Sequence, residues 1–258
     1  MSKPKRKRKF KPTFKNGGFW EHYKDLERQF EEFLDYVPYI DENKGIRSFK
    51  LTNILLNIGG HIDSAFKEMA RYPKFYRRKN SKCKKIVEIV RENRQKIKRD
   101  EFASGPGIKL CIETFEEIYE LSKKEVKFKR LPSRENIFPF APHNPKTNAP
   151  YWWDIYNHTK HDYHEYFEKT NLEATKDALA GAFLLNAIHM PSVLRLFRYG
   201  VFKIEFEPDV FGGEYFREIA TPEWVKQEYE KTLQLPARLE TSLFIYKYGE
   251  SEQDEYYV

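Results

Sequence analysis

The chain has 258 residues, of which 40% are apolar and 16% aromatic, enough for the core of one large domain or two small ones. Its two cysteines define no disulfide framework and neither lies in a CxxC pair, and we expect reduced, largely buried thiols in a cytoplasmic protein. No apolar stretch reaches the roughly 18 residues that a bilayer span needs, so we expect no membrane association.

The net charge of +7 is concentrated in a basic N-terminal tail, which we assign to residues 1–18 and expect to be disordered. Residues 3–15 contain no acidic residue and eight basic ones: Lys3, Lys5, Arg6, Lys7, Arg8, Lys9, Lys11 and Lys15. Such a tail binds RNA or another polyanion through counterion release, or serves only as a solubilising arm. A second basic block, residues 71–99, is either a solvated helix face or a further RNA-binding element.

Four helices are predicted after the tail. Apolar residues recur at helical spacing over residues 20–37 and again, more regularly, over residues 51–69, where Ser48 is available as the N-cap. A third helix with basic outer faces is predicted over residues 83–97. A fourth follows a Gly-Pro-Gly segment and covers residues 108–122.

The second of these helices carries polar residues that bear on function. Asp63 and Lys67 lie four residues apart, in the order that favours an ion pair. His61 lies beside the apolar stripe, where a lone histidine is more often a hydrogen-bonded core residue than a metal ligand. Gly59 and Gly60 interrupt the pattern, and we interpret them as a site of close helix packing.

The second half of the chain changes character twice. Residues 126–150 contain five prolines and predict a long loop, after which Pro150 suits the first turn of a helix that we expect to run to about Lys169. Residues 178–185 are apolar on every side and predict a central buried helix. Two later segments have the alternating or β-rich pattern of strands, residues 202–206 and 243–246.

These elements predict an all-α fold, a helical bundle with a small β-containing C-terminal extension. We place the bundle domain at residues 19–198 and an α+β extension at residues 199–258.

The segment from Trp152 to Asp162 is the strongest candidate for a functional site. As a helix it places Asn157 and His161 one turn apart, with Lys160 beside them. The face then carries an amide, a cation and a group that exchanges protons near neutral pH. RNA cleavage without a metal needs this set when the ribose 2′-OH is the nucleophile, because a proton must be moved and a phosphate neutralised.

Two other interpretations of the segment stay open. In one, its His and Asn side chains are structural and tie the helix to its neighbours. In the other they bind a metal, using His158, His161, Asp162 and His164 with His61 or His143. No HExxH or CxxC spacing supports a metal, and the chain has no P-loop, GxGxxG or GxSxG motif, so we predict neither metal nor other cofactor.

The residues Tyr156-Asn157-His158-Thr159-Lys160-His161-Asp162, with the apolar helix that follows, resemble the YNxxKH motif of uncharacterised all-helical proteins related to the HEPN superfamily (higher eukaryotes and prokaryotes nucleotide-binding). Residues 63–67, Asp-Ser-Ala-Phe-Lys, resemble the acid-xxx-Lys motif on an early helix of that superfamily. The resemblance implies a four-helix core, often in a homodimer, that cleaves RNA without a metal in toxin-antitoxin or phage-defence systems.

Under this resemblance His161 is the general acid or base, Asn157 its polar partner, Lys160 the cation, and Asp63 with Lys67 a supporting pair. Active members usually carry an Arg four to six residues before the His, whereas positions 155–157 here are Ile, Tyr and Asn, so the motif lacks this Arg. Inactive members act as binding or adaptor modules. We therefore expect an RNA-binding protein with a candidate endoribonuclease site. The alternative is a non-catalytic helical interaction protein, with a protein partner, in which the motif residues are structural.

Overall fold

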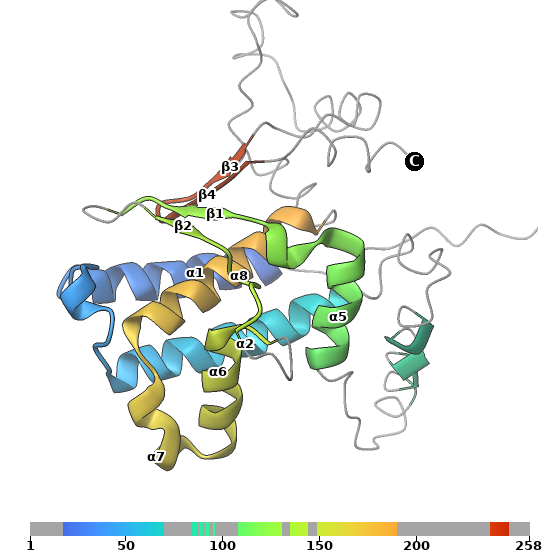
Figure 1. The fold of residues 1–258 in the computed structure, drawn as a ribbon, viewed down its shortest axis with the longest axis horizontal. Coiled ribbons are helices and arrows are strands. Elements are labelled where there is room, and N and C mark those ends of the chain that lie inside the picture. Colours follow the sequence, from blue (N-terminus) through green and yellow to red (C-terminus); the bar gives the residue numbers. More distant parts are fainter. Residues whose placement is uncertain are drawn as a thin grey trace, which may run out of the picture.

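A computed structural model of the chain describes residues 18–69, 108–130, 135–143, 149–189 and 238–247, together with part of residues 84–95. The described chain is mostly helical and carries a small antiparallel sheet of four strands (Figure 1). The basic tail and the strand predicted at residues 202–206 lie outside the described residues. No helix among the described residues is both long and apolar enough to cross a membrane.

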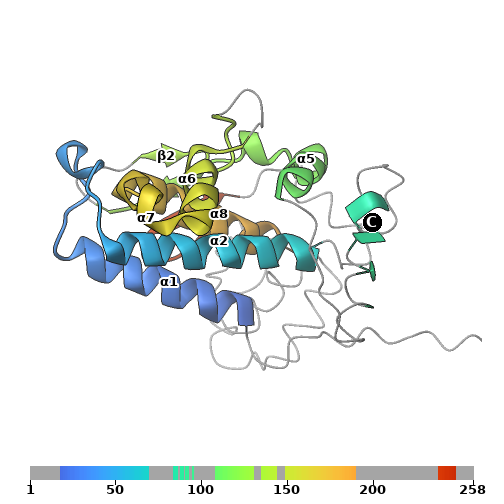
Figure 2. The ribbon, with the colours of Figure 1, turned by 90° about the horizontal axis from the view of Figure 1, so that it is seen from below.

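The first two predicted helices are confirmed as α1, Gly18–Leu34, and α2, Phe49–Met69. Ser48 caps α2 as predicted, because its Oγ accepts a hydrogen bond from the Leu51 amide at 3.1 Å. The two helices lie side by side along most of their length (Figure 2). Their facing surfaces contribute large side chains to the core, among them Tyr23, Phe30, Leu55, Ile58 and Phe66.

The central helix is α8, Leu172–Ile188, and its burial on all sides is confirmed. It begins at Asn171, whose side chain accepts from the Ala174 amide at 2.8 Å. It contacts α1, α2 and α6 as well as strands β1 and β4, so both layers of the fold pack on it. The arrangement explains why residues 178–185 are apolar on every side: within the described structure this part of the helix has no solvent-facing stripe.

The helix predicted at residues 108–122 is confirmed as α5, Ile108–Tyr119, followed by a short 3₁₀ turn at Leu121–Lys123. Cys111 on α5 is buried, and burial raises the pKa of its thiol to about 12, which keeps it protonated and unreactive. The other cysteine lies outside the described residues. The helix predicted over residues 83–97 is described only in part, and those residues are helical.

The helix that bears the candidate site is shorter than predicted. It is α6, Tyr151–His161, and the continuation expected to about Lys169 is instead a four-residue helix, α7 (Tyr163–Tyr166), and a 3₁₀ turn at Phe167–Lys169. The break is at Asp162, whose φ and ψ of −143° and 87° are not helical. Its carboxylate accepts from the Glu165 amide at 3.1 Å, so Asp162 acts as an N-cap and starts a new helix.

The sheet corrects the prediction of a loop over residues 126–150. Strands β1 (Val126–Phe128) and β2 (Asn136–Ile137) arise within that segment, and β3 (Arg238–Glu240) and β4 (Phe244–Lys247) arise near the end of the chain. The order is β2-β1-β4-β3, with β1 antiparallel to β4. The β-rich character of residues 243–246 is thereby confirmed, and these strands share the core of the helices through Phe244, which packs on Phe183 of α8.

Candidate functional site

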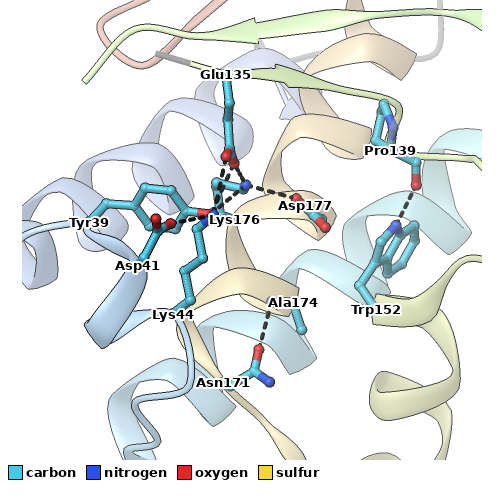
Figure 3. A network of polar contacts seen from close by, with 10 residues as sticks. All are labelled: Tyr39, Asp41, Lys44, Glu135, Pro139, Trp152, Asn171, Ala174, Lys176 and Asp177. Atoms are coloured by element: carbon cyan, nitrogen blue, oxygen red, sulfur yellow. Dashed lines mark hydrogen bonds and ion pairs between the residues drawn. The ribbon is translucent and has the colours of Figure 1, made fainter. Parts of the chain in front are cut away.

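Helix α6 has one buried face and one exposed face, and the candidate residues are divided between them. Its aromatic and aliphatic residues face the core: Trp152, Trp153, Ile155 and Tyr156 are all buried. Trp152 is held further by its indole N–H, which donates to the Pro139 carbonyl at 2.6 Å (Figure 3). Asn157, Lys160 and His161 are on the exposed face. Packing therefore fixes the helix while the three polar side chains stay in solvent.

The polar side chains on the exposed face of α6 are available to contact a ligand. Asn157 and His161 are one turn apart on one helix, so their side chains lie on the same side, with Lys160 adjacent. Within the part of the chain that the structure describes, none of the three side chains takes part in an intramolecular hydrogen bond or ion pair. Lys160 lies 5.7 Å from the centre of the Tyr156 ring. All three can therefore contact a ligand without breaking a bond inside the protein.

The proposed supporting pair, Asp63 and Lys67, does form an ion pair on α2. Both side chains are half-buried, and both act electrostatically on Cys111 of α5. The pair is thus close to α5, as the influence on that thiol requires.

Helix α6 packs on α2, but no hydrogen bond, ion pair or ring contact among the described residues joins Asp63 or Lys67 to His161. The Tyr156 ring lies against Gly59. Beyond it, the turn after α6 meets the start of α2, where Phe167 stacks on Phe49 at 4.2 Å. His161 is on the turn of α6 after Tyr156, and Asp63 is on the turn of α2 after Gly59. The structure brings together Asn157, Lys160 and His161 on one helix and shows Asp63 and Lys67 as an ion pair on another helix, α2.

The prediction of a hydrogen-bonded core histidine is confirmed at His61. It lies in a row that joins three helices: its Nε2 is 3.1 Å from Asn186 Nδ2 on α8, and its Nδ1 is 3.2 Å from His22 Nδ1 on α1. Asn186 Nδ2 also donates to the Ala182 carbonyl at 2.9 Å, so it is the amide nitrogen and His61 Nε2 accepts from it.

The proton of neutral His61 is therefore on Nδ1, which donates to His22 and leaves no lone pair on His61 for a metal. Burial, and then the neighbouring His22, lowers the pKa of His61 to about 3. Hydrogen bonds between uncharged side chains thus connect α1, α2 and α8 in the core.

A cluster of charged residues that the sequence did not reveal surrounds Lys176 of α8 (Figure 3). Lys176 Nζ donates to Tyr39 Oη at 2.6 Å, pairs with Glu135, and lies 3.2 Å from Asp177 Oδ1. Burial lowers the pKa of Lys176, although Asp177 opposes that shift, and burial likewise raises the pKa of Asp177. The cluster joins three distant segments of the chain and is saturated with internal partners, so we assign it a structural role.

A second buried charge, Glu27 of α1, anchors the C-terminal hairpin. Its carboxylate accepts from Tyr23 Oη at 3.0 Å, from the Leu243 amide at 3.3 Å, and from Thr241 Oγ1. Lys24 completes its set of partners. A charged residue inside an otherwise apolar stripe was the available signal for both Glu27 and Lys176, but the identity of the partners depends on the tertiary fold.

Within the described residues, no group of three or more His, Cys, Asp or Glu side chains is arranged to hold a metal ion. The histidines that the metal interpretation would have combined are on different surfaces: His61 is in the core, whereas His158, His161 and His164 are exposed. A scan against models of protein families, a search of curated proteins and a search of solved structures each found no match for this chain.

Proposed function

We propose that the chain is a HEPN-like helical bundle that binds RNA on the exposed face of α6 and cleaves it without a metal. The observation that carries the proposal is the arrangement of Asn157, Lys160 and His161. They lie within little more than one helical turn, in solvent, on a helix whose opposite face is held by buried aromatic residues. The resemblance of this segment to the YNxxKH motif supports the same function.

The chemistry follows from the side chains. A histidine takes the proton from a ribose 2′-OH, the 2′-oxygen bonds to the adjacent phosphorus, and the 5′-oxygen of the next nucleotide leaves with a proton. The products are a 2′,3′-cyclic phosphate and a 5′-hydroxyl. Lys160 would neutralise charge on the phosphate, and the Asn157 amide would hydrogen-bond a phosphate oxygen or the ribose.

The reaction needs a base and an acid, and the exposed face of one α6 supplies a single His161. A homodimer in which two α6 helices face each other would supply both, one His161 taking a proton while the other gives one. Exposure of the motif supports this arrangement because no segment of the described chain covers it. The basic tail, with its eight Lys and Arg residues, would add affinity for the RNA backbone without sequence preference.

The alternative is an interaction protein without catalysis. In one version of this alternative, Asn157, Lys160 and His161 are structural and tie α6 to the neighbouring helices. That version is disfavoured because these side chains are exposed and make no hydrogen bond within the described structure. The residues that do brace α6 are Trp152 and Tyr156. The remaining form of the alternative is binding of RNA or of a protein partner by the same face without cleavage.

A substitution at His161 tests the enzyme. We expect His161→Ala to slow cleavage of a single-stranded RNA in the presence of a metal chelator by at least about a hundredfold. Its melting temperature should stay nearly unchanged, because the side chain is exposed. His143→Ala is the matched control, since His143 is also exposed but lies outside α6 and α7. Equal cleavage by the parent and His161→Ala would refute the catalytic role.

A further inference from the structure

Three aromatic side chains stack beside the candidate site, one of them exposed and two partly buried, and we call Phe49, Tyr163 and Phe167 the aromatic platform. Phe49, the first residue of α2, is 64% exposed. Its ring stacks on Phe167 with centroids 4.2 Å apart and planes 20° apart. Tyr163 is nearly parallel to Phe49, at 10° and 6.4 Å. Figure 2 shows why they meet: α7 lies across the first part of α2.

A second stack connects the platform to α6. His158 lies parallel to Tyr166 of α7, with centroids 4.6 Å and planes 15° apart. Lys169 Nζ sits 4.1 Å from the centre of the same Tyr166 ring. His158 is three residues before His161 on α6, so flat rings and cations continue from the platform to the proposed catalytic face.

The exposure of Phe49 within this group of rings is typical of a ligand-binding surface. Burying a Phe side chain contributes about 1.5–3 kcal/mol, so a Phe left mostly in solvent at a helix start gives up that stabilisation. Single exposed apolar residues are common, but Phe49 adjoins the partly exposed rings of Tyr163 and Phe167, and a contiguous ring surface of this kind marks a binding site. The rings here are interleaved with Lys160, Lys169 and three exposed histidines, whereas an apolar protein interface excludes charge from its centre.

We infer that the aromatic platform stacks the bases of single-stranded RNA and leads its backbone to His161. This inference rests on the proposed function and names its substrate class. Every base has a flat face, so stacking on rings accepts any sequence but requires unpaired bases. A duplex would be excluded because its bases are already stacked on each other. Purines, which have larger faces, would bind more tightly than pyrimidines.

The charges around the platform predict how RNA binding should depend on salt. Asp162, Glu165 and Glu168 are exposed between the cations, so the local charge is close to balanced. Stacking on the platform should therefore resist salt, whereas attachment of the basic tail to phosphates should weaken steeply as salt rises. At about 0.5 M salt the remaining affinity of the full-length chain should come mainly from the platform.

The experiment measures binding of the full-length chain to fluorescent 12-nucleotide adenine and uracil RNAs, an abasic oligomer of equal length and a duplex, at low and high salt. In high salt, Phe49→Ala and Phe49→Leu should each weaken binding of the adenine RNA roughly tenfold, because a base loses one stacking partner. Phe49→Trp should retain binding, since it restores a flat ring. Tyr36→Ala is the control, because Tyr36 is 86% exposed and makes no ring contact with the platform.

The outcomes separate this inference from the proposed function. Unchanged adenine RNA affinity in Phe49→Ala and Phe49→Leu, with cleavage still dependent on His161, would overturn the platform and leave the nuclease standing. Equal affinity for abasic and adenine RNA would also overturn it. If Phe49→Ala changes only the oligomeric state measured by light scattering, the surface is a protein interface instead. A parent chain that binds no RNA at all would refute both proposals.

Discussion

Gly59 and Gly60 are neighbours in α2, yet the structure predicts opposite effects for the same substitution. A Cβ at Gly59 would lie 2.2 Å from Tyr156 Cε2, 2.3 Å from Cδ2 and 2.5 Å from Cζ, whereas a Cβ at Gly60 would meet nothing within 4 Å. An ordinary carbon contact needs about 3.5 Å or more, so the Tyr156 ring would have to move by more than about 1 Å. The ring is also packed against buried Trp153, with the two ring centres 4.7 Å apart, which limits its freedom to move.

The magnitude follows from two opposing effects. Replacing a helical Gly by Ala stabilises the helix by about 1 kcal/mol, and overpacking a core costs about 3 kcal/mol when the neighbours are rigid. We therefore expect Gly59→Ala to lower the free energy of unfolding by about 2 kcal/mol and Gly60→Ala to raise it by about 1 kcal/mol. Urea denaturation followed by circular dichroism measures both values.

A double substitution tests the cause. In a Tyr156→Leu background the large ring is absent, so the cost of Gly59→Ala should shrink to near zero. If Gly59→Ala and Gly60→Ala shift stability in the same direction, the packing of α6 on α2 at Gly59 is not as described. An unchanged cost in the Tyr156→Leu background would refute the assignment of that cost to the ring.

The buried His61 and Glu27 give two further predictions. Burial lowers the pKa of His61 in the folded protein to about 3, from an ordinary value of 6.5. The stability that depends on neutral His61 is therefore fully present above pH 6.5 and is lost as the pH falls toward 3. Unfolding free energy should thus fall by about 2 kcal/mol from pH 7 to pH 5, and a His61→Gln variant with the same slope would contradict this. Glu27→Ala leaves buried donors without an acceptor and should cost about 3 kcal/mol or more, against about 0.5 for exposed Glu32→Ala. Thermal denaturation compares the two, and similar costs would show that Glu27 does not anchor the hairpin.

The helices that could be predicted from the sequence are those whose apolar residues repeat over several turns. That local signal was sufficient for residues 51–69 and for the buried helix at residues 178–185. It failed at Asp162, where the capping of a new helix competes with continuation of the old one and the choice depends on one side chain. It also failed for β1 and β2, which are two or three residues long and exist because β1 pairs with the distant β4 and β2 pairs with β1.

The candidate site was predicted in the same uneven way. Helical periodicity alone placed Asn157 and His161 on one face, and their exposure follows from the burial of the opposite face. The relation of His161 to Asp63 depends on the register of two helices nearly 100 residues apart in the chain, which is set by the packing of Tyr156 on Gly59. The aromatic platform likewise needed tertiary structure, since Phe49 and Phe167 belong to separate helical segments.

The sheet that joins β1 to β4 also determines when the molecule can finish folding. Phe128 pairs with Phe244, and Thr241 reaches Glu27 across a sequence separation of 214 residues. Such distant contacts form late, because the intervening chain must first be ordered. On the ribosome, α1, α2 and α8 would all emerge before β3 and β4, leaving Glu27 without its hairpin donors and Phe183 without Phe244. The helical core is therefore incomplete until β3 and β4 have been synthesised and have packed on it. Synthesis that stalls before residue 244 would leave apolar core residues exposed and prone to aggregation.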